Sequence, residues 1–96
     1  MNSAIFVEFD PLRQVFIRVH GRAPIGLTQE EIFRQTIEVI GESAWVDKNL
    51  SKMFLAAVVQ MDFAKAHAIS LLEAAKSIFG IRFNSLEELQ ISLDYE

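Results

Sequence analysis

The feature that most constrains the fold is a helical pattern of apolar residues that runs without interruption over residues 46–79. Apolar side chains such as Leu50 and Phe54 recur there at spacings of three and four, the period of an α-helix. A straight helix over this range would be about 50 Å long, which is longer than a compact domain of 96 residues. We therefore expect a break near Gln60–Asp62, with Asp62 as a new N-cap. The alternative is one long helix that a second copy of the chain covers.

Two short segments near the N-terminus alternate apolar residues with other residues. Ile5–Phe9 and Val15–Val19 both show this period of two, which is typical of β-strands, and both are rich in β-branched and aromatic residues. Asp10 and Pro11 between them suit a type I turn. The sequence therefore predicts a β-hairpin with a five-residue loop, because that loop length places the alternating apolar residues of both strands on one face.

The next segment carries a complete helix-start signal. Thr28 followed by Glu31 forms a capping box, and Leu27 with Ile32 forms a hydrophobic staple. Gly41 is a suitable residue for the C′ position, just beyond the last turn. We expect a helix from Thr28 that ends before Gly41.

The C-terminal segment is predicted to add one helical turn and a strand. Residues 85–88 repeat the capping-box pattern, and residues 91–95 alternate apolar and polar side chains. Together these elements give a single α+β domain over residues 1–96, in the order β-β-α-α-α-β. Its small antiparallel sheet, made of the N-terminal hairpin and the C-terminal strand, would pack on two or three helices.

Charge and composition narrow the class of protein. The net charge is −4 and the basic residues are scattered, so we expect no nucleic-acid partner, because phosphate binding needs a basic face. The chain has no cysteine, which excludes disulfides and thiolate metal sites and favours a reducing compartment. The N-terminus lacks the pattern of a signal peptide, and the uncharged stretch Met53–Met61 is too short to cross a bilayer. We expect a cytoplasmic protein without a membrane segment.

No residue pattern in the chain predicts catalysis, a cofactor or a metal site. His20 and His67 lack an acid or a second histidine at i+3 or i+4, the spacing that places two ligands on one helix face. Ser70 lies three residues after His67, but no acid nearby in sequence would orient the imidazole. Glu38 and Glu42 would share one helix face, and we interpret them as part of its solvated surface.

The preferred functional hypothesis is a non-enzymatic protein-interaction module that acts as a homodimer, as an adaptor, a chaperone-like protein or an inhibitor. It follows from the apolar content of 51%, which is high for a domain with little interior. The candidate partner-binding residues are Phe6, Phe16, Arg18, Trp45, Met53 and Phe54.

Each candidate has a structural alternative. Trp45 is either an interface anchor or a core residue, and the stretch Met53–Val59 is either the centre of a dimer or part of the core. A second functional hypothesis is a small-molecule-binding or catalytic domain with a pocket between sheet and helices, lined by Glu8, Arg18 and His20.

Overall fold

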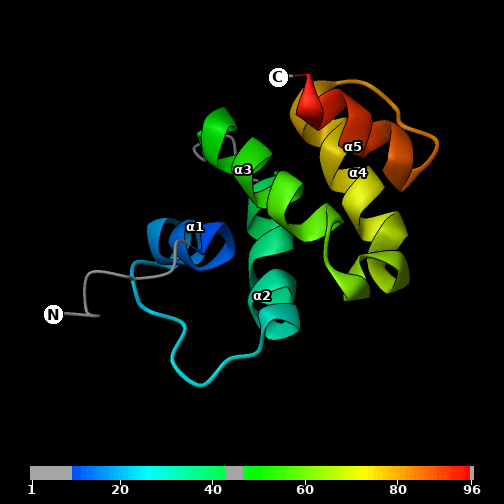
Figure 1. Ribbon diagram of the computed structural model, residues 1–96. Helices are drawn as coiled ribbons and strands as arrows, with labels where there is room; N and C mark the ends of the chain where they lie inside the picture. Colours follow the sequence, from blue (N-terminus) through cyan, green and yellow to red (C-terminus); the bar gives the residue numbers. More distant parts are fainter. Residues whose placement is uncertain (1–9, 43–46, 96) are drawn as a thin grey trace, which may run out of the picture.

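All regular secondary structure in the described residues is helical (Figure 1). The computed structural model describes residues 10–42 and 47–95. The elements are α1 (Pro11–His20), α2 (Gln29–Glu42), α3 (Lys48–Val59), the 3₁₀-helix η2 (Asp62–His67), α4 (Ala68–Phe79) and α5 (Leu86–Asp94). The predicted α+β class is therefore wrong, since these two ranges contain no strand from which a sheet could form.

The segment predicted to be the second hairpin strand belongs to α1. Asp10 is the N-cap: its carboxylate accepts hydrogen bonds from the backbone N–H groups of Leu12 and Arg13. Pro11 occupies the first turn, where a missing N–H costs nothing. Asp-Pro is as good a helix start as it is a turn, so this signal did not distinguish the two structures. The other predicted strand, residues 5–9, lies outside the described residues.

Burial along α1 explains why the helix is preferred to the strand. Leu12, Val15 and Phe16 are fully buried and Val19 is partly buried, and these positions follow the helical spacing i, i+3, i+4, i+7. A strand would have placed Phe16 on the opposite face from Val15, whereas the helix directs both into the core. Gly21 then ends α1 in the left-handed conformation, with a φ of 72°, which glycine adopts without steric cost.

The predicted start of α2 is confirmed, and its predicted end is wrong. The Thr28 N–H donates to the Glu31 carboxylate at 2.8 Å, and the Glu31 N–H donates to the Thr28 hydroxyl at 3.1 Å. Gly41, expected beyond the helix, lies within it, because α2 continues to Glu42. A Cβ added at Gly41 would lie 3.7 Å from both Cα and Cβ of Ala74. α4 therefore packs closely on α2 here, and a methyl group at this position would still fit in ordinary van der Waals contact.

The expected break in the long apolar segment is confirmed. α3 ends at Val59, with Gln60 at its C-cap, and the helices on either side of the break are bent by 110° from one another. Met61, rather than the expected Asp62, occupies the N-cap position of η2, and its side chain makes no capping hydrogen bond. The bend allows α4 to fold back and pack along α2.

The predicted C-terminal strand is also wrong, because residues 91–94 continue α5. Ser85 caps this helix as expected, since its hydroxyl accepts a hydrogen bond from the Glu88 N–H at 3.2 Å. Leu89 is fully buried while Leu86 and Leu93 pack partly against the core, which is the helical spacing of three and four. Ile91 is exposed, so the alternation at residues 91–95 does not mark one buried face.

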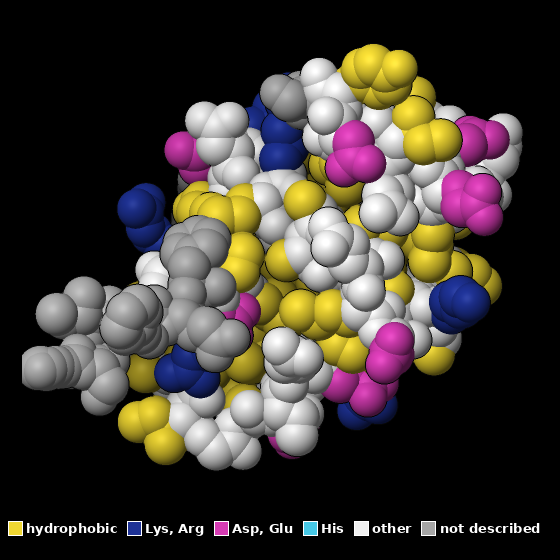
Figure 2. Space-filling view, viewed as in Figure 1, with side chains coloured by type: hydrophobic (Ala, Val, Ile, Leu, Met, Phe, Trp, Pro, Cys, Tyr) yellow, Lys and Arg dark blue, Asp and Glu magenta, His cyan; other side chains and the backbone are white. Residues whose placement is uncertain are grey.

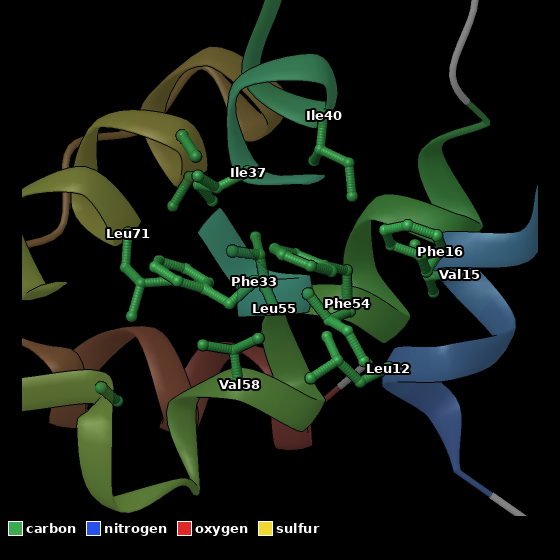
Figure 3. Close-up of a cluster of buried hydrophobic side chains, with 14 of the residues drawn as sticks. Leu12, Val15, Phe16, Phe33, Ile37, Ile40, Phe54, Leu55, Val58 and Leu71 are labelled. Atoms are coloured by element: carbon green, nitrogen blue, oxygen red, sulfur yellow. The ribbon is translucent and has the colours of Figure 1, made fainter. Parts of the chain in front are cut away.

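The core lies where α1, α2, α3 and α4 meet (Figure 3). The rings of Phe33 from α2 and Phe54 from α3 stack with centroids 6.0 Å apart. Val15 and Phe16 close the core at the α1 end, and Leu71 of α4 reaches it from the other side. α2 is therefore held between α1 and α4, and α5 packs on α3 and α4 (Figure 1).

No single helix in the described ranges is both long and apolar enough to cross a bilayer. α3 reaches the necessary length and hydropathy only together with the segment Asp62–Phe79, and the two are bent by 110° from one another.

Candidate functional site

A surface groove runs between the C-terminal half of α2 and the middle of α4. Its volume is about 290 Å³. The lining residues are Ile37, Glu38, Gly41, Glu42, Ser70, Glu73, Ala74 and Ser77. We refer to it as the α2–α4 groove. It combines apolar or small residues, which lie where the two helices approach, with carboxylates and hydroxyls at the exposed positions.

The α2–α4 groove is negatively charged. Glu38 and Glu42 come from α2 and Glu73 comes from α4, and no lysine or arginine lines the groove. Within the described part of the chain, none of these three carboxylates forms an ion pair. Glu38 and Glu42 also lie in the last two turns of α2, and the last turn of this helix carries no basic side chain. The partial charge of a helix C-terminus is negative and adds to that of the carboxylates. The groove therefore favours a cationic group.

Carboxylates in a groove raise the question of a metal site. Among the described residues, no group of three or more His, Cys, Asp or Glu side chains is arranged to hold a metal ion. The groove instead offers carboxylate oxygens around an apolar floor, and such oxygens accept hydrogen bonds from ammonium and guanidinium groups.

His67 has the acidic partner that no nearby sequence position supplied. Its Nε2 lies 2.7 Å from the carboxylate of Glu30, which is 37 residues away in sequence. The His67 ring also packs against Phe33, with centroids 4.9 Å apart. In the part of the chain that the structure describes, no hydrogen bond joins His67 to Ser70. The pair thus ties the end of η2 to the start of α2.

His20 joins α1 to α2. Its Nε2 lies 3.2 Å from the hydroxyl oxygen of Thr36, a fully buried side chain, and its ring packs on Phe16 with centroids 4.3 Å apart. Burial lowers the pKa of His20 below its ordinary value of 6.5, and the positive charge of Arg22 lowers it further, while a hydrogen bond with the backbone of Gln35 acts in the opposite direction. The neutral imidazole is therefore the form that the fold favours.

The structure places the predicted partner-binding residues in different environments. Phe6 and Trp45 lie outside the described residues. Phe16 and Phe54 are fully buried in the core, so their side chains offer no surface to a partner in this arrangement. Arg18 is exposed on α1 and Met53 is partly buried on α3.

Apolar side chains do reach the surface over α3. Figure 2 shows them along the middle of the face that α3 forms between α1 and α5, with charged side chains mostly toward the edges. We refer to the partly buried apolar residues of α3 as the α3 stripe; they are Leu50, Met53, Ala56, Ala57 and Val59.

Only part of the α2–α4 groove could be predicted from the sequence. The i, i+4 spacing of Glu38 and Glu42 shows that they share a face, but nothing local shows that Glu73 and Ser70 face them from α4. The signal that could have found this pairing is Gly41 inside a helix together with the alanines of α4, because small residues mark helices that pack closely.

Comparisons with known proteins do not extend this description. No protein-family model, no curated protein and no solved structure matches the chain.

Proposed function

We propose that the chain is a non-enzymatic protein-interaction module and that the α2–α4 groove is its binding site. The observation that carries this proposal is the combination of three carboxylates, which form no ion pair with a described residue, and an apolar floor in one groove between two packed helices. Such a site binds a side chain that has both an apolar stem and a positive charge, or an apolar side chain with a cation beside it.

The size of the groove favours a protein partner over a small metabolite. A volume of about 290 Å³ lies just below the range of roughly 300–1,000 Å³ that is typical of small-molecule pockets. It accommodates one or two side chains of a larger partner, whose remaining contacts would fall on the rim. An apolar centre with a charged rim is also the usual anatomy of a protein–protein interface.

An exposed apolar residue beside the groove supports this reading. Ile69 on α4 is 80% exposed, and it precedes the groove residue Glu73 by one helical turn, so both lie on the same face of the helix. A partner seated in the groove would cover Ile69 as well. The burial of this side chain would add an apolar contribution of about 1.5–3 kcal/mol at most to binding.

The proposal is tested with designed helical peptides and the isotope-labelled protein. One peptide carries an isoleucine flanked by arginines on one face, and its matched control carries glutamates in place of the arginines. We expect the first peptide, and not the control, to shift the amide resonances of groove residues such as Glu38 and Ser77. The protein variant Glu42→Lys/Glu73→Lys should lose this response.

The same experiment can also contradict the proposal. If neither peptide shifts the groove residues, and a thermal-shift screen finds a metabolite that raises the melting temperature by several degrees, the proposal fails and the small-molecule hypothesis replaces it.

A further inference from the structure

We infer that the occupant of the α2–α4 groove is a second copy of this chain, which inserts the exposed face of its α1. This inference rests on the proposed function, because it names the partner of the same groove. It is carried by a match between two surfaces of one molecule: an acidic groove with an apolar floor, and a basic helix face with an apolar centre.

The exposed face of α1 consists of Arg13, Gln14, Ile17 and Arg18. On a helix, Arg13 lies one turn before Ile17, and Gln14 lies one turn before Arg18, so the four exposed side chains form two adjacent rows of one patch. Ile17 is 39% exposed although its helix buries Leu12 completely. This α1 patch therefore presents an isoleucine between two arginines.

The charges of the α1 patch are not neutralised by any residue in the ranges 10–42 and 47–95. α1 itself contains no acidic residue, and neither Arg13 nor Arg18 forms an ion pair with any of the described residues. Arg22, the next arginine, differs from these two. Its guanidinium lies over the Phe16 ring, 5.1 Å from the centroid, and it donates a hydrogen bond to Gln35. Among the described residues, Arg13 and Arg18 are thus the two arginines of this region without such a contact.

The two surfaces are complementary in both charge and polarity. Ile17 matches the apolar floor formed by Ile37 and Ala74. The arginines that flank it would meet the glutamates of the rim, and a guanidinium can bind a carboxylate through two parallel hydrogen bonds. Close contact between the patch and the groove would therefore bring two cations to three carboxylates and reduce the repulsion among them.

The α1 patch cannot reach the groove of its own chain. His20 and Thr36 fix α1 against α2, and the buried side of α1 faces the core. The α1 patch consists of the positions that point away from that core. Only a second molecule can therefore bring an α1 patch to the groove. Two copies can pair reciprocally and form a closed dimer, or pair head to tail in a chain.

The test is a charge swap measured by sedimentation velocity. The patch variant is Arg13→Glu/Arg18→Glu, and the groove variant is Glu42→Lys/Glu73→Lys; all four positions are exposed. We expect wild-type protein to self-associate reversibly at low salt and each variant alone to associate at least about tenfold more weakly. An equimolar mixture of the two variants should regain most of the lost affinity, because the new glutamates face the new lysines.

A matched control separates a specific contact from a general effect of charge. Glu87→Lys/Asp94→Lys changes the net charge as much as the groove variant does, but on the exposed side of α5. This control should associate about as tightly as wild type, and circular dichroism should show that all variants keep their helical content. Wild-type association should also weaken at high salt, since exposed charge pairs are screened.

Three outcomes would overturn the inference. The first is a wild-type protein that stays monomeric at millimolar concentration while the arginine-flanked peptide still binds in the groove; the proposed function then stands with a different partner. The second is self-association that survives both charge reversals, which would assign the contact to another surface such as the α3 stripe. The third is a mixture that associates no better than the separate variants. A monomer that also ignores the peptide would overturn the proposed function as well.

Discussion

His20 shows how one side chain can make the stability of the fold depend on pH. Its imidazole contacts the buried Thr36 hydroxyl and the Phe16 ring, and burial together with Arg22 lowers its pKa below 6.5. The unfolded chain, whose histidine has its ordinary pKa, therefore takes up the proton first as the pH falls. The contribution of neutral His20 to stability is complete well above pH 6.5 and is lost as the pH falls through the lower pKa of the folded state.

We predict that the free energy of unfolding decreases between pH 7.5 and pH 5.5 and that His20→Gln removes much of this decrease. Urea denaturation at several pH values measures the effect, and the ring resonances of His20 should titrate below pH 6.5. His67→Gln is the matched control for the other histidine of the chain. A His20 resonance that titrates at or above pH 6.5 would contradict the explanation.

Helix starts were the elements best predicted from the sequence, because a capping box is a local signal with one geometry. The start of α2 at Thr28 and the cap of α5 at Ser85 are both as expected. α1 was misread because its start, Asp10-Pro11, also suits a turn and because residues 15–19 alternate by chance. What decides between helix and strand is that Val15 and Phe16 are both buried in the core. The surfaces that bury them belong to α2 and α3, so the segment itself does not contain this information.

The cap of α1 provides a direct test of this helix. Asp10→Ala removes the acceptor for the N–H groups of Leu12 and Arg13 and should destabilise the protein by about 1 kcal/mol. Asp10→Asn keeps an acceptor and should cost much less. Denaturant titration of the three proteins gives the comparison. If the alanine variant is as stable as wild type and residues 15–19 show the chemical shifts of a strand, α1 is not the native structure of this segment.

Replacement by alanine should have opposite effects at two glycines, Gly41 inside α2 and Gly80 at the C-cap of α4. Gly41 has helical geometry, and an added methyl group would meet Ala74 at 3.7 Å, an ordinary van der Waals distance. Gly41→Ala should therefore stabilise the protein by about 0.5–1 kcal/mol, since alanine favours the helix. Gly80, by contrast, has open space around it, but its φ is +70°, so Gly80→Ala should destabilise the protein by about 1–2 kcal/mol. Thermal denaturation of both variants checks the two signs, and a stabilising Gly80→Ala or a destabilising Gly41→Ala would contradict them.

At the scale of the whole molecule, the groove exists because the chain turns sharply after α3. The 110° bend at the break returns α4 to α2, and this return places Glu73 and Ser70 opposite Glu38 and Glu42. No local sequence pattern contains that pairing. The sequence could show that the long segment must break and that two glutamates share a face, but which helices the break would bring together depends on how the whole core is filled.

The groove carboxylates lead to a prediction in which stability and binding change in opposite directions. Glu42 lies in the last turn of α2 and one turn from Glu38, so it opposes both the helix dipole and a like charge. Glu42→Lys replaces these two repulsions by attractions and should stabilise the isolated chain by about 0.5–1 kcal/mol. The same change puts a cation into the groove and should weaken both self-association and the binding of the arginine-flanked peptide. Thermal denaturation at low protein concentration and peptide titration, done on the same preparation, measure the two effects.

Glu87→Lys, on the exposed surface of α5, serves as control and should leave peptide binding unchanged. If Glu42→Lys weakens binding but also destabilises the chain, the carboxylate has a structural role; if it stabilises the chain and binding is unaffected, the groove is not the binding site. Only the opposed pair of effects is consistent with a negative charge that destabilises the monomer and is neutralised by its partner.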